Sequence, residues 1–378
     1  MDELIGFLKH PQATVRQQAA THVHGLTGSP DGLAALKTCQ TLVPALARLT
    51  GDVQSIAQSA LSALINLAEV PELIRDFETC AIVNRLAENL HQEGYALMQL
   101  DIILLANLTS KSDKIVNDLL SARGGATLLM LANALKDDVE GKHESLDCVT
   151  NIITNVARSQ PGRVFLQNKE KDLVKGLLEQ IYSKEPFRRR GMLLFLSNLL
   201  FNKDMIAYLT APGLDYANKI LTLVTGESVI KHDQDEEALC TILKTLCTLA
   251  ANVRGRNELK RIKALERIKG LDILELPEGK TRTNLLELLD ILEDRKVAVE
   301  PGGDASGQAK AGQVVALDRE KMAADGVSFI DGKLVQSDKA SAPTLPAAAA
   351  DVQEIDEKTA DLHIDASDSD GEEEMGLD

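Results

Sequence analysis

Apolar positions in the first 295 residues recur at the three- and four-residue spacings of an amphipathic helix, and whole blocks of them repeat along the chain. In residues 53–68 one such stripe is formed by Ile56, Ala60, Leu64 and Leu67. The block ends in Asn-Leu, and related endings return later. We take seven positions as equivalent: Gly25, Asn66, Asn107, Asn155, Asn198, Thr248 and Asp290. Their spacings are 41, 41, 48, 43, 50 and 42 residues, which predicts a repeat protein with insertions in two repeats.

Each repeat is predicted to contain three helices. A short helix at Leu33–Lys37 is followed by a second helix at Leu42–Leu49 and a long third helix at Val53–Ala68. Prolines fall between predicted helices or in their first turns, where a missing amide does no harm: Pro11, Pro30, Pro71, Pro161, Pro186 and Pro212. One helix cannot bury its apolar stripe alone, so neighbouring repeats have to stack. The pattern predicts an all-α, armadillo/HEAT-like α-solenoid whose third helices form the concave face.

The end of the chain departs from this pattern. Residues 296–378 contain 7 basic and 19 acidic residues, a net charge of −12, whereas residues 1–295 contain 34 and 38, a net charge of −4. The end segment is rich in Gly, Ala and Ser and has one aromatic residue, Phe329, so it cannot bury enough surface to offset the entropy of ordering. We expect two parts: an armadillo-like helical repeat domain at 1–295 and a disordered acidic Gly/Ala/Ser-rich tail at 296–378.

Two features of the tail deserve separate expectations. Residues 327–335 place Asp331 and Gly332 between two apolar runs, which indicates a tight hairpin. A lone two-stranded hairpin is marginal, so it should be unfolded unless it docks on the body. Ser367 and Ser369 precede acidic residues, the setting that acidophilic kinases prefer, and phosphate would add about −1.5 to −2 charge to each.

Composition bounds the location and the chemistry. Hydrophobic residues make up 44% of the chain but aromatic residues only 3%, and no apolar run reaches the roughly 18 residues that a membrane span needs. The start lacks the pattern of a signal peptide, and five scattered cysteines suit a reducing compartment. We therefore expect a cytoplasmic monomer without a membrane partner.

No catalytic signature is present in the sequence. Gly279, Lys280 and Thr281 resemble part of a phosphate loop, but Leu274 stands where that motif requires glycine. The seven histidines are scattered, and no Cys-x-x-Cys pair offers zinc ligands. We expect a protein that is not an enzyme, with no cofactor and no metal.

The candidate binding residues are polar residues on the third helices and two basic clusters. Asn66, Asn107, Asn155 and Asn198 could bond to a neighbouring repeat, which is the structural interpretation, or bind an extended peptide in the groove. The clusters are Arg188–Arg190 and the basic residues between 254 and 269, from which we select Arg188, Arg189, Arg256 and Lys260. They could be solvated helix faces or a docking surface for an acidic segment, including the tail. Nucleic acid is disfavoured because no aromatic residue is interleaved for stacking.

Several segments resemble one family. Glu3–Gly28, Ile103–Ser110, Gly162–Leu166, Ser197–Phe201 and Gly255–Lys260 are similar, in order, to the eukaryotic HGH-type armadillo-like proteins. The resemblance implies a non-enzymatic cytosolic chaperone adaptor that assists folding of translation elongation factor 2, with the TRiC chaperonin and Hsp90-type chaperones as partners. A second hypothesis is an armadillo-type scaffold that binds linear peptides in trafficking or signalling.

Overall fold

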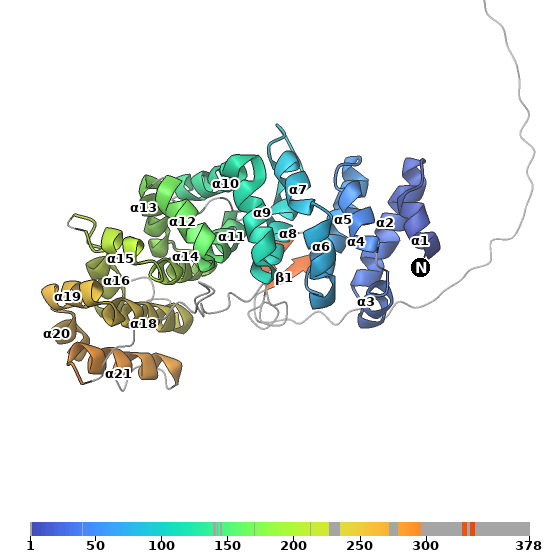
Figure 1. The fold of residues 1–378 in the computed structure, drawn as a ribbon. Helices are drawn as coiled ribbons and strands as arrows, with labels where there is room; N and C mark the ends of the chain where they lie inside the picture. The colour runs from blue at the N-terminus through green and yellow to red at the C-terminus, as the bar shows by residue number, and fades with distance from the viewer. Residues whose placement is uncertain are drawn as a thin grey trace, which may run out of the picture.

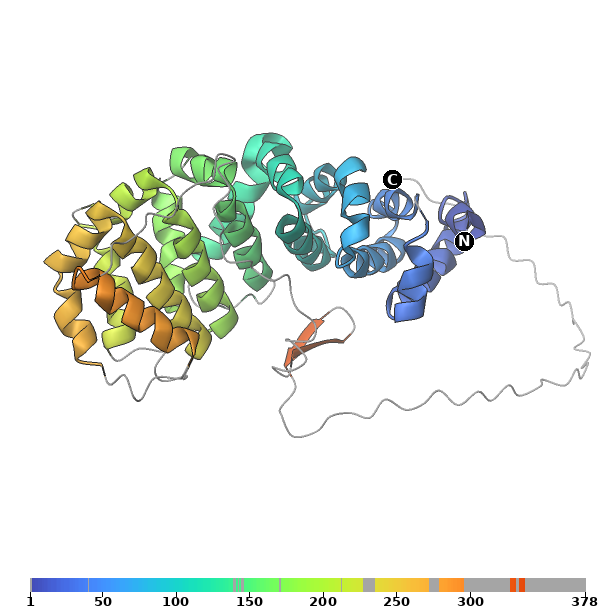
Figure 2. The same ribbon diagram turned by 60° about the horizontal axis from the view of Figure 1, so that its bottom comes forward.

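The computed structural model describes residues 2–39, 41–138, 141, 143, 146–169, 171–211, 213–226, 235–271 and 279–295, together with two strands at 327–330 and 333–336. The helices form an elongated stack from blue to orange (Figures 1 and 2). The predicted disorder of the tail, and the serines at 367 and 369, lie outside the described residues. The two described strands coincide with the hairpin that residues 327–335 predict.

The helices fall into three series, one of each per complete repeat. The first helices are α3 (Pro30–Leu36), α6 (Ile74–Thr79, preceded by a 3-10 turn at Pro71–Leu73), α9 (Asp113–Ser121), α12 (Gln160–Lys169), α15 (Lys203–Leu209) and α19 (Val253–Arg261). The second helices are α1 (Asp2–Leu8), α4 (Leu42–Leu49), α7 (Ile82–Leu90), α10 (Ala126–Asp137), α13 (Lys171–Leu178), α16 (Tyr216–Thr225) and α20 (Ala264–Lys269). The third helices are α2 (Ala13–Thr27), α5 (Gln54–Leu67), α8 (Met98–Lys111), α11 (Asp147–Arg158), α14 (Pro186–Leu199), α18 (Glu236–Ala251) and α21 (Lys280–Leu292).

The predicted repeat is confirmed by these bounds. Each of the seven equivalent positions lies in its own third helix, and each third helix packs on the next from α2 to α21. The second helix at Leu42–Leu49 is confirmed to the residue, whereas α3 begins at Pro30 rather than Leu33. The earlier start follows from Ser29, whose side chain accepts a hydrogen bond from the amide of Gly32 and so caps the helix.

The two insertions that the spacings predict lie at one kind of connection. Between α4 and α5 the chain turns within residues 50–53, but residues 138–146 separate α10 from α11 and residues 226–235 separate α16 from α18. Both long connections therefore join a second helix to a third helix. Residues 139, 140, 142, 144, 145 and 227–234 lie outside the described part of the chain.

Connections from a third helix to the next first helix share a capping device. Ser159 and Asn252 cap α12 and α19, and the following glycines, Gly162 and Gly255, lie against the carbonyl end of the preceding third helix. The arginine that follows the glycine bonds to the end of the third helix: the guanidinium of Arg163 donates to Ala157 O and Arg158 O at 3.0 and 2.6 Å. These contacts account for the Gly-Arg pairs that the sequence repeats at both places.

The core is aliphatic and continuous along the stack. Leu64 and Leu108, from the second and third repeats, are fully buried, as are Leu196 and Leu246 further along. Among the described residues no single helix is both long and apolar enough to cross a bilayer; α14 and α15 reach that length only together, across a bend of 119°.

Candidate functional site

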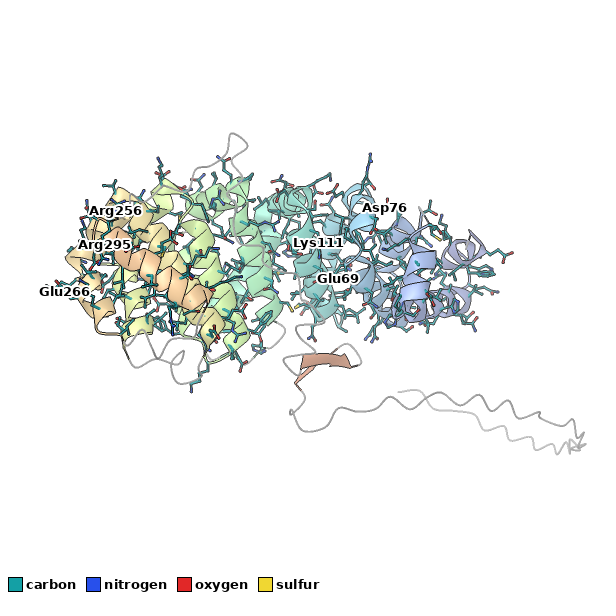
Figure 3. The ribbon with its side chains drawn as sticks, turned by 90° about the horizontal axis from the view of Figure 1, so that it is seen from below. Glu69, Asp76, Lys111, Arg256, Glu266 and Arg295 are labelled. Carbon is teal, nitrogen blue, oxygen red and sulfur yellow. The ribbon has the colours of Figure 1, made fainter. Side chains whose placement is uncertain are left out.

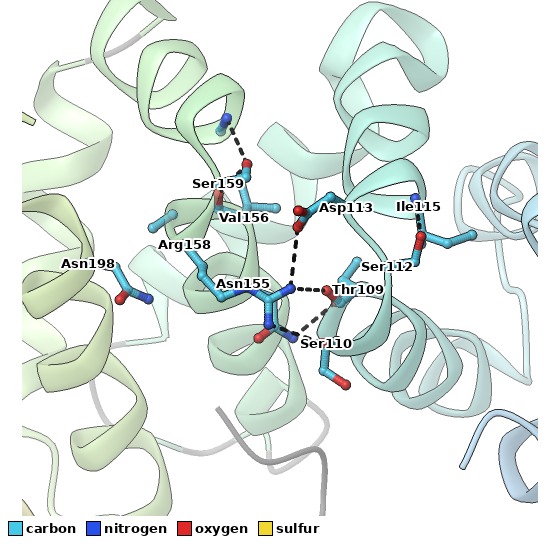
Figure 4. Close-up of polar contacts among 12 residues, drawn as sticks. Thr109, Ser110, Ser112, Asp113, Ile115, Asn155, Val156, Arg158, Ser159 and Asn198 are labelled. Carbon is cyan, nitrogen blue, oxygen red and sulfur yellow. Dashed lines mark hydrogen bonds and ion pairs between the residues drawn. The ribbon is translucent and has the colours of Figure 1, made fainter. Parts of the chain in front are cut away.

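Three of the four predicted asparagines of the third helices, Asn66, Asn155 and Asn198, bond to the preceding repeat, whereas Asn107 is buried with its amide oxygen unpaired. The side-chain amide of Asn155 donates to Thr109 Oγ1 on α8 at 3.2 Å (Figure 4). It also donates to Ala106 O on the same helix, at 3.2 Å. Asn198 donates to Thr154 O at 3.1 Å, and Asn66 donates to Thr27 Oγ1 at 2.8 Å. Asn107, Asn155 and Asn198 are at most 4% exposed. We call this row of asparagines on successive third helices the asparagine ladder. The geometry supports its structural interpretation, and little of its surface is exposed to a ligand.

Arg188 and Arg189 are buried, so we correct the expectation that they form a docking surface. The Arg188 guanidinium donates to Asp147 Oδ1 at 2.8 Å and to Asp138 Oδ2 at 3.0 Å, with both side chains mostly out of solvent. Arg189 pairs with Asp235 at 2.7 Å, and neither arginine has measurable exposure. A buried charge needs such partners because desolvation would otherwise cost several kcal/mol. Arg188 therefore links the two ends of the 138–146 connection, and Arg189 binds the end of the 226–235 connection.

In the second basic cluster, three of the seven basic side chains pair with carboxylates of the described residues. Arg256 caps α18 by donating to Ala250 O and Ala251 O at 2.8 and 3.2 Å. Lys260 is exposed but pairs with Asp294 at 2.9 Å, and the pairing holds the pKa of Asp294 below its usual value. Lys269 pairs with Glu293 and Arg261 with Glu258. Figure 3 shows this end of the stack, with Arg256, Glu266 and Arg295 labelled. Of the selected residues only Lys260 presents its charge at the surface.

A different surface joins the repeats at the places where second helices give way to third helices. We call this row of connections the corner edge; it comprises residues 7–13, 49–54, 90–98 and 178–187, together with the described residues of the connections at 137–147 and 226–235. Side chains link adjacent corners: Arg16 pairs with Asp52 at 2.6 Å, and the pairing lowers the pKa of Asp52. Further along, the amide of Asn89 donates to Thr50 O and that of Gln180 to Leu135 O. Arg188 and Arg189 continue the same series of links.

The corner edge also carries most of the exposed apolar surface. Five of the eight exposed large apolar side chains in the described part of the chain lie there: Phe7 (49% exposed), Val53 (57%), Met98 (38%), Tyr182 (41%) and Phe187 (38%). Val53, Met98 and Phe187 occupy the starts of α5, α8 and α14, so the repeat itself spaces them along the edge. Spaced in this way, the exposed side chains offer a partner a row of separate apolar contacts. Sequence reasoning missed it because these residues stand just outside the helical stripes.

One buried carboxyl interrupts the core near this edge. Asp101 of α8 is fully buried, and burial raises its pKa to about 7. Asn89 and Tyr95, the polar groups nearest to it, lower that pKa in part. Helices α5, α11 and α14 have Ala60, Val149 and Met192 six residues before the asparagine, where α8 has Asp101. The described residues contain no cluster of three or more side chains that could hold a metal ion.

Comparisons with known proteins agree with this architecture. Residues 89–259 match a family described as a domain of unknown function, DUF383. The chain is 21% identical over 319 residues to the Protein HGH1 homolog of Dictyostelium discoideum, covering 77% of this chain and 90% of that protein. It is 30% identical over 296 residues to the Protein HGH1 homolog of Drosophila pseudoobscura pseudoobscura, covering 75% and 72%.

Solved structures show the fold alone. A designed armadillo repeat protein in complex with the peptide (KR)4 superposes with a TM-score of 0.55 at 18% identity, covering 66% of this chain and 99% of that one. A structure from a study of the interaction between cadherin and beta-catenin gives a TM-score of 0.57 at 18% identity, covering 77% and 52%. The armadillo-like α-solenoid predicted from the repeat period is thereby confirmed.

Proposed function

Because the chain belongs to the HGH1 protein family, we propose that it is a non-enzymatic, cytoplasmic chaperone adaptor that binds translation elongation factor 2 while that protein folds. The family resemblance supplies the client and the expected co-workers, the TRiC chaperonin and Hsp90-type chaperones. The single observation that supports a binding role most strongly is the row of exposed apolar side chains on the corner edge. A partly folded client exposes apolar surface of its own, and a row of separate apolar contacts can hold such a chain without requiring one fixed sequence.

The rest of the molecule is suited to presenting this surface to a client in a rigid arrangement. Asn66, Asn155 and Asn198 bond between neighbouring third helices, and Arg188 and Arg189 are paired inside the stack, so these side chains fix the spacing of the repeats instead of contacting a partner. Rigid presentation lowers the entropy cost of binding, because the surface is already ordered before the client arrives. In this account no residue of the chain carries out covalent chemistry.

The alternative is a scaffold for linear peptides in trafficking or signalling. The designed armadillo protein that resembles this fold was solved with a basic peptide. Here the ladder asparagines that would hydrogen-bond a peptide backbone are at most 4% exposed from α8 to α14, which favours the first function.

An affinity capture from the source cell with the full chain as bait, read by mass spectrometry, separates the two functions. Translation elongation factor 2 and chaperonin subunits should dominate the captured proteins if the chain is a folding adaptor. Transport, coat or signalling proteins carrying a common short motif would instead support the scaffold. Capture from cells in which protein synthesis is arrested provides the control, because a folding client should then be depleted while a mature partner should not.

A further inference from the structure

A cleft of about 360 Å³ lies between two successive repeats, outside the corner edge. Its walls come from α12, α13 and α15, in the green part of the stack (Figure 1). The residues that line it belong to first and second helices, so the cleft is separate from the asparagine ladder of the third helices. The exposed large apolar side chains that are not on the corner edge also lie outside the cleft: Val164, Val253 and Leu286.

The floor of the cleft is apolar. Leu166, Val174 and Met205 line it and are at most 2% exposed, so the floor is part of the core. Ala207 and Ala211 are the other aliphatic lining residues, and their small side chains leave room for a ligand. Methylene groups of a ligand would gain free energy by leaving water for such a floor.

The rim of the cleft has a negative charge. Asp204 is the one charged residue among those that line the cleft. Its Oδ2 accepts a hydrogen bond from the Gln167 amide at 3.3 Å, and the oxygen of Gln167 accepts one from the Asn202 amide at 3.1 Å. These bonds hold the carboxylate in place through one oxygen and leave Asp204 Oδ1 without a partner among the described residues.

An aromatic ring neighbours this carboxylate. Tyr208 follows Asp204 by four residues on α15, so the two side chains share a face of the helix, and both line the cleft. Burial raises the pKa of Tyr208, and the charge of Asp172 on α13 raises it further, so a second carboxylate acts on the same end of the cleft. A ring face beside carboxylates suits a guanidinium, which stacks on the ring while it donates to the carboxylate.

A second cleft of about the same volume has the opposite charge. It lies between α4 and α7, and its charged lining residues are Arg48, Arg85 and Glu88. Its two arginines would repel a cation. An acidic rim is therefore a property of the cleft at Asp204 and not of every space between repeats.

We propose that the cleft between α12, α13 and α15 is a docking site for an arginine side chain of a partner protein. The guanidinium lies against Asp204 and Tyr208, and the methylene groups of the arginine cover Leu166 and Met205. Arginine fits better than lysine, because its planar fork donates to Asp204 Oδ1 and stacks on the ring at the same time. The site goes beyond the proposed function, because it does not depend on which protein occupies the corner edge.

Methyl NMR of the full chain, labelled with ¹³C at the methionine methyl groups, tests the proposal. Met205 reports on the cleft, and Met98 reports on the corner edge. The probe is the peptide acetyl-Ala-Arg-Ala-amide, compared with the same peptide carrying lysine or citrulline, which has the shape of arginine without its charge. We expect the arginine peptide to shift the Met205 signal saturably and to bind at least about threefold more tightly than either of the other two peptides.

Two variants separate the charge of Asp204 from general effects. Asp204→Asn should abolish the preference for arginine over citrulline, because the charged acceptor is lost. Asp31→Asn is the matched control and should keep that preference, since Asp31 lies in the first turn of α3 as Asp204 lies in the first turn of α15.

Several results would overturn the proposal. A Met205 signal that does not move would show that the cleft binds no such side chain, and a shift confined to Met98 would place the peptide on the corner edge. Equal affinities for the arginine and citrulline peptides, or equal losses in Asp204→Asn and Asp31→Asn, would remove the role of the Asp204 charge. Equal affinities for arginine and lysine would remove the choice of a guanidinium. None of these results bears on the client of the corner edge, so the proposed function is tested separately.

Discussion

The side-chain amide of Asn155 lies 3.2 Å from the hydroxyl of Thr109, which belongs to the preceding third helix. Thr109 stands two residues after the ladder position of its own helix, as Thr27 does in the first repeat, where it accepts a hydrogen bond from Asn66. Each such bond joins one repeat to the next, and the same two positions make it in both places. The regular spacing of these asparagines therefore reflects the hydrogen bonds that they make between stacked repeats.

Asn155→Ala should destabilise the protein by about 1–3 kcal/mol, because it leaves Ala106 O and Thr109 Oγ1 without their buried donor. Urea denaturation followed by circular dichroism measures the change. Asn117→Ala, an exposed asparagine on α9, is the matched control and should shift stability by no more than about 0.5 kcal/mol. Equal losses for the two variants would remove the ladder's structural role.

Arg188→Met should cost about 3–5 kcal/mol, because Asp138 and Asp147 lose the cation that compensates their burial. Arg75→Met on α6 removes an exposed guanidinium and should be nearly neutral. Thermal melting of both variants makes the comparison. A stable Arg188→Met variant would mean that the long 138–146 connection is held by other contacts.

Gly162→Ala should be strongly destabilising, since the added methyl carbon would lie 2.0 Å from the carbonyl oxygen of Val156. The connection between α11 and α12 would have to open, which would break the hydrogen bond from Arg163 to Ala157 O. Gly6→Ala in α1 meets no atom within 4 Å and should instead gain up to about 1 kcal/mol of helix stability. Opposite shifts in melting temperature are the expected outcome.

Asp101 should make the protein less stable as the pH rises. Its pKa is about 7 in the folded chain, above the value of about 3.9 in an unfolded one, so the folded state holds the proton more tightly. The favourable contribution is complete below pH 4 and is lost as the pH rises through 7. Asp101→Asn should match the parent near pH 4 and exceed it by ~1–4 kcal/mol at pH 8. The control variant Asp118→Asn removes a partly exposed carboxylate that pairs with Lys114 on α9, and it should show no such growing difference between the two pH values.

The sequence predicted the fold well but not the burial of Arg188 and Arg189, for one physical reason. Helix period and proline placement are local signals, so the third helices and even the bounds Leu42–Leu49 could be predicted. Burial of Arg188 and Arg189 depends on Asp138 and Asp235, which lie 50 and 46 residues away. Three adjacent arginines look like an exposed cluster until those partners are known.

The two long connections contained a signal that Arg188 and Arg189 have buried acidic partners. Both long insertions carry an acidic residue at a boundary, Asp138 in one and Asp235 in the other, and both residues end up buried. The Gly-Arg pairs at 162–163 and 255–256 likewise mark arginines that cap helices. The pairing of residues 327–330 with 333–336 agrees with the hairpin that the sequence predicts, because pairing between strands so close in sequence is again local.

The central claim is that the corner edge, rather than the basic clusters, binds the client. It is tested most directly by titrating non-native translation elongation factor 2 with the full chain and with two matched triple variants. Val53→Ser/Met98→Ser/Phe187→Ser should weaken binding by at least about tenfold, or ~1.4 kcal/mol, while Val164→Ser/Val253→Ser/Leu286→Ser should bind as the parent does. Equal affinities for all three proteins, together with a large loss on reversing the charge of Lys260, would contradict the account.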